Sequence, residues 1–154
     1  MGNAEEAGMA DNGETLPGQH GEALFRLAVE ASPNAMVMVN DRGQITMVNQ
    51  QTERLFGYPR AELLGQRIEM LVPQRNRERH PEHRDGYLSA PGNSAMGSGR
   101  DLYGLTKDGR EVPVEIGLNP LQTAEGRFVL ASIVDITERK RAEERLLQVV
   151  EAAP

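Results

Sequence analysis

The chain contains 154 residues with no cysteine, and its formal net charge is −6. This length fits one domain with short tails. The absence of cysteine excludes disulfides, thiolate zinc sites, iron–sulfur clusters, covalent haem attachment and thiol-linked flavin photochemistry. No apolar run is long enough to cross a bilayer, and the polar, acidic start is unlike a signal peptide, so we expect a soluble, cytoplasmic chain.

The negative charge is concentrated at the N-terminus. Residues 1–23 contain five acidic residues and no Lys or Arg, whereas the remainder is close to neutral. A nucleic-acid partner is not expected, because no concentrated basic region is present. Residues 1–20 are rich in Gly, Ala, Asn and Glu and are predicted to form a disordered acidic tail, since they have too few large apolar side chains to fold.

The first half of the remaining chain predicts one helix, two strands and several short helices. Leu24, Ala28 and Ala31 recur at helical spacing, and Pro33 ends that helix. The next elements are strands over 35–40 and 45–49 around a tight turn at 41–44, short helices over 50–57 and 60–65, an apolar turn over 68–72, a helical segment over 75–88 interrupted by Pro81, and a loop over 90–99.

The second half predicts three strands, over 100–106, 111–121 and 127–136, joined by hairpin turns at 107–110 and 123–126. Apolar residues alternate along the middle strand, so one of its faces is predicted to be buried. These residues are Val112, Val114, Ile116 and Leu118. The predicted fold class is therefore α+β, with a five-stranded antiparallel sheet and short helices on one face.

The chain is predicted to end in a helix that leads to a further domain. Asp135 is a candidate cap, with Glu138 three residues later. The helix carries a coiled-coil-like stripe formed by Ala142, Leu146, Val149 and Ala153. The sequence VVEAAP at 149–154 echoes AVEASP at 28–33; the echo is either a coincidence or the start of a second copy of the same domain.

Several short motifs, in this order, resemble the signatures of PAS sensor domains. They are VNDRG at 39–43, VN at 48–49, LFGY at 55–58, LG at 64–65, KDG at 107–109 and DITERK at 135–140. The resemblance implies a PAS domain over 21–137, with an N-terminal cap helix, and a signalling helix over 138–154. It also implies dimerisation through the N-terminal and C-terminal helices, and an effector in the same full-length chain, such as a histidine kinase of a two-component system or a diguanylate cyclase.

A second part of the resemblance is closest to the haem-binding PAS oxygen sensors. The distances along the chain from His80 to Arg100 and from His80 to the KDG turn match those sensors. The resemblance assigns His80 as the axial iron ligand and Arg100 as the arginine on the gas side. It places Ile116 and Leu118 on the apolar wall of the gas pocket, with Met96 as a further cofactor contact.

Other functions stay open at this point. No catalytic constellation and no phosphate-binding glycine motif is present, so the segment is predicted to be a sensor and not an enzyme. The leading hypothesis is sensing of oxygen or another diatomic gas through haem b. The alternatives are a cofactor-free dimerisation and relay module, or a module that binds FAD or an unidentified small ligand.

Overall fold

The computed structural model describes residues 19–77, 94–96 and 102–152. The chain divides into two compact units between Ser32 and Pro33. Within the first unit, helix α2 (Gln19–Ala31) forms where the sequence predicted a helix, but it begins at Gln19, inside the predicted tail. Leu24 and Leu27 on this helix are exposed. The rest of the predicted N-terminal tail lies outside the described residues.

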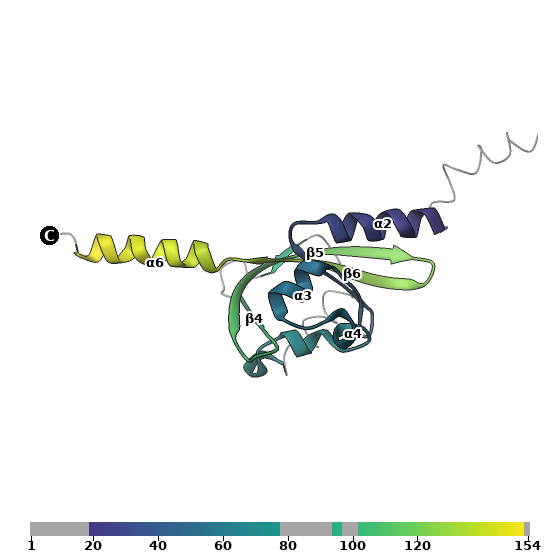
Figure 1. Cartoon of the computed structure of the whole chain (residues 1–154), viewed down its shortest axis with the longest axis horizontal. Helices are drawn as coiled ribbons and strands as arrows, with labels where there is room; N and C mark the ends of the chain where they lie inside the picture. Colours follow the sequence, from purple (N-terminus) through teal and green to yellow (C-terminus); the bar gives the residue numbers. More distant parts are fainter. Residues whose placement is uncertain (1–18, 78–93, 97–101, 153–154) are drawn as a thin grey trace, which may run out of the picture. The chain divides into compact units, whose positions relative to one another are not determined.

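The second unit is built on an antiparallel sheet (Figure 1). Its neighbours run in the order β2–β1–β6–β5–β3, and β4 also pairs with β5. The sheet has six strands, but it is five strands wide because β3 and β4 pair with different parts of β5. The predicted α+β class with a sheet of this width is confirmed. The strands are β1 (Ala35–Asn40), β2 (Ile45–Val48), β3 (Ser94–Met96), β4 (Leu102–Leu105), β5 (Glu111–Thr123) and β6 (Gly126–Asp135).

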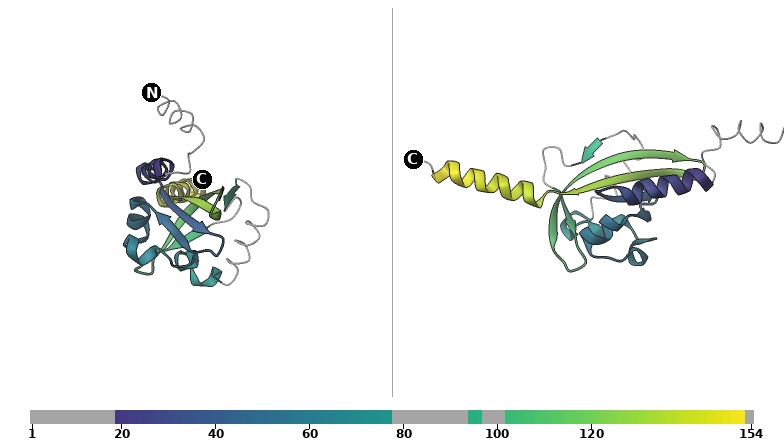
Figure 2. Two further views of the ribbon diagram at one scale, coloured as in Figure 1. Left: turned by 90° about the vertical axis from the view of Figure 1, so that its right-hand side faces the viewer. Right: turned by 45° about the horizontal axis from the view of Figure 1, so that its top comes forward.

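Short helices cover one face of this sheet and enclose the core (Figure 2). They are α3 (Gln50–Phe56), α4 (Arg60–Leu63) and the 3-10 helices η1 (Ile68–Leu71) and η2 (Gln74–Asn76). Alternate residues of β1 are buried, as a strand with one face on a core requires. The buried cluster comprises Ala35, Val37, Val39, Ile45, Val48, Phe56, Leu63, Leu71, Val112, Val114, Val129 and Ile133.

Asn49 fixes the position of α3 beside β1. Its side chain is fully buried, and its Oδ1 accepts hydrogen bonds from the backbone N–H groups of Met36 (3.0 Å) and Thr52 (3.1 Å). Its Nδ2 donates to the carbonyl oxygen of Asn34 (2.9 Å). One amide therefore serves as the N-cap of α3 and as a tie to the start of β1.

Strands β5 and β6 form a long hairpin that continues into the last helix, α6 (Thr137–Ala152). The side chains of residues 141–150 on α6 are all exposed. No helix among the described residues is long and apolar enough to cross a membrane.

Two details differ from the sequence prediction. Within the strand predicted at 100–106, β4 covers Leu102–Leu105 and Thr106 lies outside it, while residues 100 and 101 are outside the described residues. The loop predicted at 90–99 was wrong at Ser94–Met96, because these residues pair with β5 as β3. The helix predicted over 75–88 lies mostly outside the described residues.

Candidate functional site

The structure describes three of the five residues that were predicted to bind a cofactor. His80 and Arg100 lie outside the described residues. Met96 is the last residue of β3, and Ile116 and Leu118 lie on β5. The structure therefore gives the positions of three of these residues, and the cofactor-binding role of each of the five stays a prediction.

Strand pairing brings these three positions together at one edge of the sheet. Met96 is the register partner of Ile116, and Ser94 is the partner of Leu118. Ile116 and Leu118 are half-buried and pack against the core cluster. An apolar wall of partly covered side chains is compatible with a flat apolar group such as haem.

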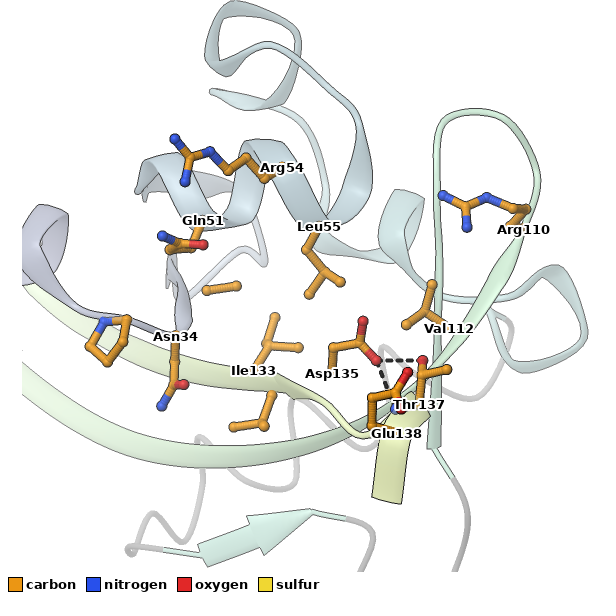
Figure 3. A pocket seen from close by; sticks show the side chains of 13 residues that line it. Asn34, Gln51, Arg54, Leu55, Arg110, Val112, Ile133, Asp135, Thr137 and Glu138 are labelled. Carbon is orange, nitrogen blue, oxygen red and sulfur yellow. Dashed lines mark hydrogen bonds between the residues drawn. The ribbon is translucent and has the colours of Figure 1, made fainter. Parts of the chain in front are cut away.

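A separate pocket of about 630 Å³ opens between α3, the β4–β5 turn and the base of α6 (Figure 3). None of the five predicted residues lines it. Its apolar lining includes Leu55, Val112 and Ile133, and charged or polar side chains surround them. These are Asn34, Gln51, Arg54, Arg110, Asp135, Thr137 and Glu138.

The start of α6 is held at the rim of this pocket. Asp135 Oδ1 accepts hydrogen bonds from the backbone N–H of Thr137 (2.8 Å) and from its Oγ1 (2.5 Å). This contact satisfies one of the free N–H groups at the start of a helix. The backbone N–H of Ile136 donates to the carbonyl oxygen of Pro113 on β5 (3.0 Å), so the junction is fixed to the sheet.

Side chains also tie α6 to the sheet and to η2. The guanidinium of Arg139 donates to Glu115 on β5 (2.5 Å), and this hydrogen bond raises the pKa of Arg139. Lys140 Nζ and the Arg75 guanidinium each lie near the ring of Tyr103, at 5.8 Å and 5.7 Å from its centroid. Tyr103 on β4 therefore contacts both η2 and the first turns of α6 through cation–π interactions.

Arg75 also pairs with Glu111 at the start of β5 (2.5 Å). The hydrogen bond between them raises the pKa of Arg75 and lowers that of Glu111. Sequence reasoning did not identify this link or the role of Tyr103, since nothing in the local pattern relates positions so far apart. Among the described residues, no three His, Cys, Asp or Glu side chains form a group that could hold a metal ion.

A family model described as PAS domain matches residues 33–138, which is more than half of the chain. The chain belongs to the PAS domain family. The matched residues of this PAS domain run from just before β1 to the first turn of α6.

Two curated relatives are larger proteins that are named as sensors. The sensor protein FixL of Bradyrhizobium diazoefficiens is 27% identical over 128 residues, which are 83% of this chain and 25% of that protein. The oxygen sensor protein DosP of Escherichia coli is 28% identical over 130 residues, which are 84% of this chain and 16% of that protein. This PAS domain therefore spans a quarter or less of the length of these two relatives.

Solved structures agree on the fold. The PAS domain of an HTR-like protein from Haloarcula marismortui superposes with a TM-score of 0.64 at 22% identity, over 77% of this chain and 93% of that one. At this level of identity the likeness concerns the fold and carries no information about a ligand.

Proposed function

We propose that this PAS domain is the sensory input and relay part of a larger cytoplasmic signalling protein, and that it binds haem b through His80 to sense oxygen or another diatomic gas. The observation that carries the proposal is the apolar wall of Ile116 and Leu118, which adjoins β3 at the register position of Met96. It is supported by the spacing of His80 and Arg100 and by the similarity to an oxygen sensor protein.

Each residue has a distinct part in this proposal. When bound, haem supplies an iron that takes up a diatomic gas. The neutral imidazole of His80 would hold the iron, and Arg100 would donate hydrogen bonds on the gas side. Ile116 and Leu118 would keep water from that side, which would slow oxidation of the iron.

The relay uses contacts that the structure describes. Ile116 pairs with Ile133 on β6, and β6 continues through Asp135 and Ile136 into α6. A shift of β5 would also act on α6 through the ion pair of Glu115 and Arg139. We propose that a homodimer, formed through the N-terminal and C-terminal helices, passes this change to an effector in the same chain.

Absorption spectroscopy tests the cofactor assignment. The chain purified from cells supplied with a haem precursor is expected to show a Soret band, and His80→Ala is expected to abolish it because the axial ligand is lost. His83→Ala is the matched control and should retain the band. An unchanged spectrum in His80→Ala would contradict the ligand assignment, and no band in any variant would favour a cofactor-free relay module.

Ligand kinetics test the role of Arg100. Arg100→Ala is expected to speed oxygen dissociation from the haem-loaded protein by about tenfold, because a charge-assisted hydrogen bond is lost. Stopped-flow absorption measures this rate, and Arg42→Ala, a change at an exposed turn, should leave it unaltered. Equal rates in Arg100→Ala and the unmodified chain would exclude a gas contact.

A further inference from the structure

The pocket between α3, the β4–β5 turn and the base of α6 contains none of the residues proposed to hold haem or contact the gas. Its volume of about 630 Å³ lies within the range of roughly 300–1,000 Å³ that small-molecule sites occupy. Leu55, Val112 and Ile133 provide an apolar surface inside it. The chemistry of the surrounding side chains indicates what it would hold.

Two arginines line the pocket, from different sides (Figure 3). Arg54 projects from α3 and makes no ion pair or hydrogen bond within the described part of the chain. Arg110 lies across the pocket on the β4–β5 turn (Figure 3). Its Nε donates to Asp108 (3.1 Å), which leaves its two terminal amino groups available. Both arginines can therefore donate to a carboxylate.

Carboxylates lie at the start of α6, and Arg54 lies on the far side of the pocket from them (Figure 3). Both hydrogen bonds that Asp135 accepts from Thr137 go to Oδ1. The second oxygen of Asp135 points into the pocket in Figure 3. Glu138 also lines the pocket, and its contact with Arg141 is long, at 3.4 Å. This side suits an ammonium group.

We propose that this pocket binds a small zwitterion of the amino-acid class with an apolar side chain. Its carboxylate would contact Arg54, its ammonium would contact Asp135 and Glu138, and its side chain would cover Leu55, Val112 and Ile133. A simple anion would face Asp135 and Glu138 without an ammonium group between them, and a simple cation would leave Arg54 without an anion. This site is independent of haem and goes beyond the proposed gas sensing.

A ligand in this pocket would act on helix α6. Asp135 holds the first residue of α6, so an ammonium group on its second oxygen would fix the carboxylate in the position that binds the Thr137 N–H. The ligand is therefore expected to slow hydrogen exchange at the amides of the first turn of α6.

NMR titration of the full chain tests the site, with L-leucine as the probe. Leucine is expected to shift the amide signals of Arg54, Leu55 and Thr137 in a saturable way. Two analogues that each lack one charge, 4-methylpentanoate and 3-methylbutylamine, should bind about tenfold more weakly, as should leucine to Arg54→Gln. Arg54→Gln should leave the affinity for 3-methylbutylamine unchanged, since that probe has no carboxylate.

The control is Arg42→Gln, which removes an exposed arginine outside the pocket and should leave leucine binding unaltered. Arg54 is exposed, so its substitution is not expected to unfold the chain, and a thermal melt of each variant verifies this. The proposal is overturned if leucine produces no saturable shift up to about 10 mM. It is also overturned if 4-methylpentanoate binds as tightly as leucine, or if folded Arg54→Gln binds leucine normally.

Discussion

Gly104 shows how one residue can decide the packing of this fold. A Cβ atom at Gly104 on β4 would lie 2.7 Å from Cε1 of Phe56, a buried ring of α3. Real side chains do not approach so closely, and the ring has no room to withdraw in a packed core. We therefore expect Gly104→Ala to lower the free energy of unfolding by about 1–3 kcal/mol, as measured by urea denaturation.

A second glycine in the same sheet is the control for this prediction. Within the described part of the chain, and apart from its two chain neighbours, Gly117 on β5 has no atom within 4 Å of the position that a Cβ would take. Gly117→Ala should therefore change the free energy of unfolding by no more than about 0.5 kcal/mol. Equal effects of the two substitutions would show that the contact with Phe56 is not the cause.

At the scale of elements, α6 carries an apolar surface wider than the predicted stripe. Leu146 and Val149 belong to that stripe, and Leu147 and Val150 extend it; all four are at least 60% exposed. A helix this apolar on one side is typical of coiled-coil partners. We expect Leu146→Asp combined with Val149→Asp to weaken dimerisation at least tenfold, measured by analytical ultracentrifugation, because two charges would be buried in the interface.

Gln148→Asp provides the matched control, since it places a negative charge on the same helix away from the stripe. It should leave the dimer unaltered. A molecular mass that is the same for the double variant and the unmodified chain would show that this surface of α6 is not the interface.

At the scale of the whole second unit, ion pairs join elements that are distant in sequence. Arg75 of η2 binds Glu111 of β5, Lys107 of the β4–β5 turn binds Glu62 of α4, and Arg139 of α6 binds Glu115. The pKa of Glu111 is lowered mainly by its hydrogen bond to Arg75. Its stabilising contribution is therefore complete above the unfolded-state pKa and is lost as the pH falls through the lower folded-state pKa.

Because the folded-state pKa of Glu111 is lowered, the stabilising effect of its ion pair should depend on pH. Glu111→Gln should have a slightly lower Tm than the unmodified chain at neutral pH. The difference should shrink as the pH falls below the unfolded-state pKa and vanish once the carboxyl group is protonated in both states. Glu125→Gln, at a turn carboxylate without an ion pair in the described residues, should show no such pH-dependent difference. A difference for Glu111→Gln that persists in acid would show that the ion pair is not its origin.

Some elements could be predicted from the sequence, and others could not. The alternation at Val112, Val114, Ile116 and Leu118 correctly predicted which face of β5 meets the core. Strand β3 was missed because Ser94–Met96 is too short to show a period, and it forms through pairing with β5. The candidate site was predicted only as residue assignments, and Met96, Ile116 and Leu118 could be placed together because strand pairing relates positions 20 or more residues apart.

The sequence by itself determined the α+β class, the three hairpin turns, the last helix and the absence of thiol chemistry, because periodicity, turn residues and composition are local properties. The order of its short motifs carried the resemblance to PAS domains. The tertiary structure decided the environment of Tyr103, the ion pairs that link η2 and α6 to β5, and the pocket at Asp135. Each of these joins residues from separate elements, and such contacts are set by the way the sheet and helices pack against one another.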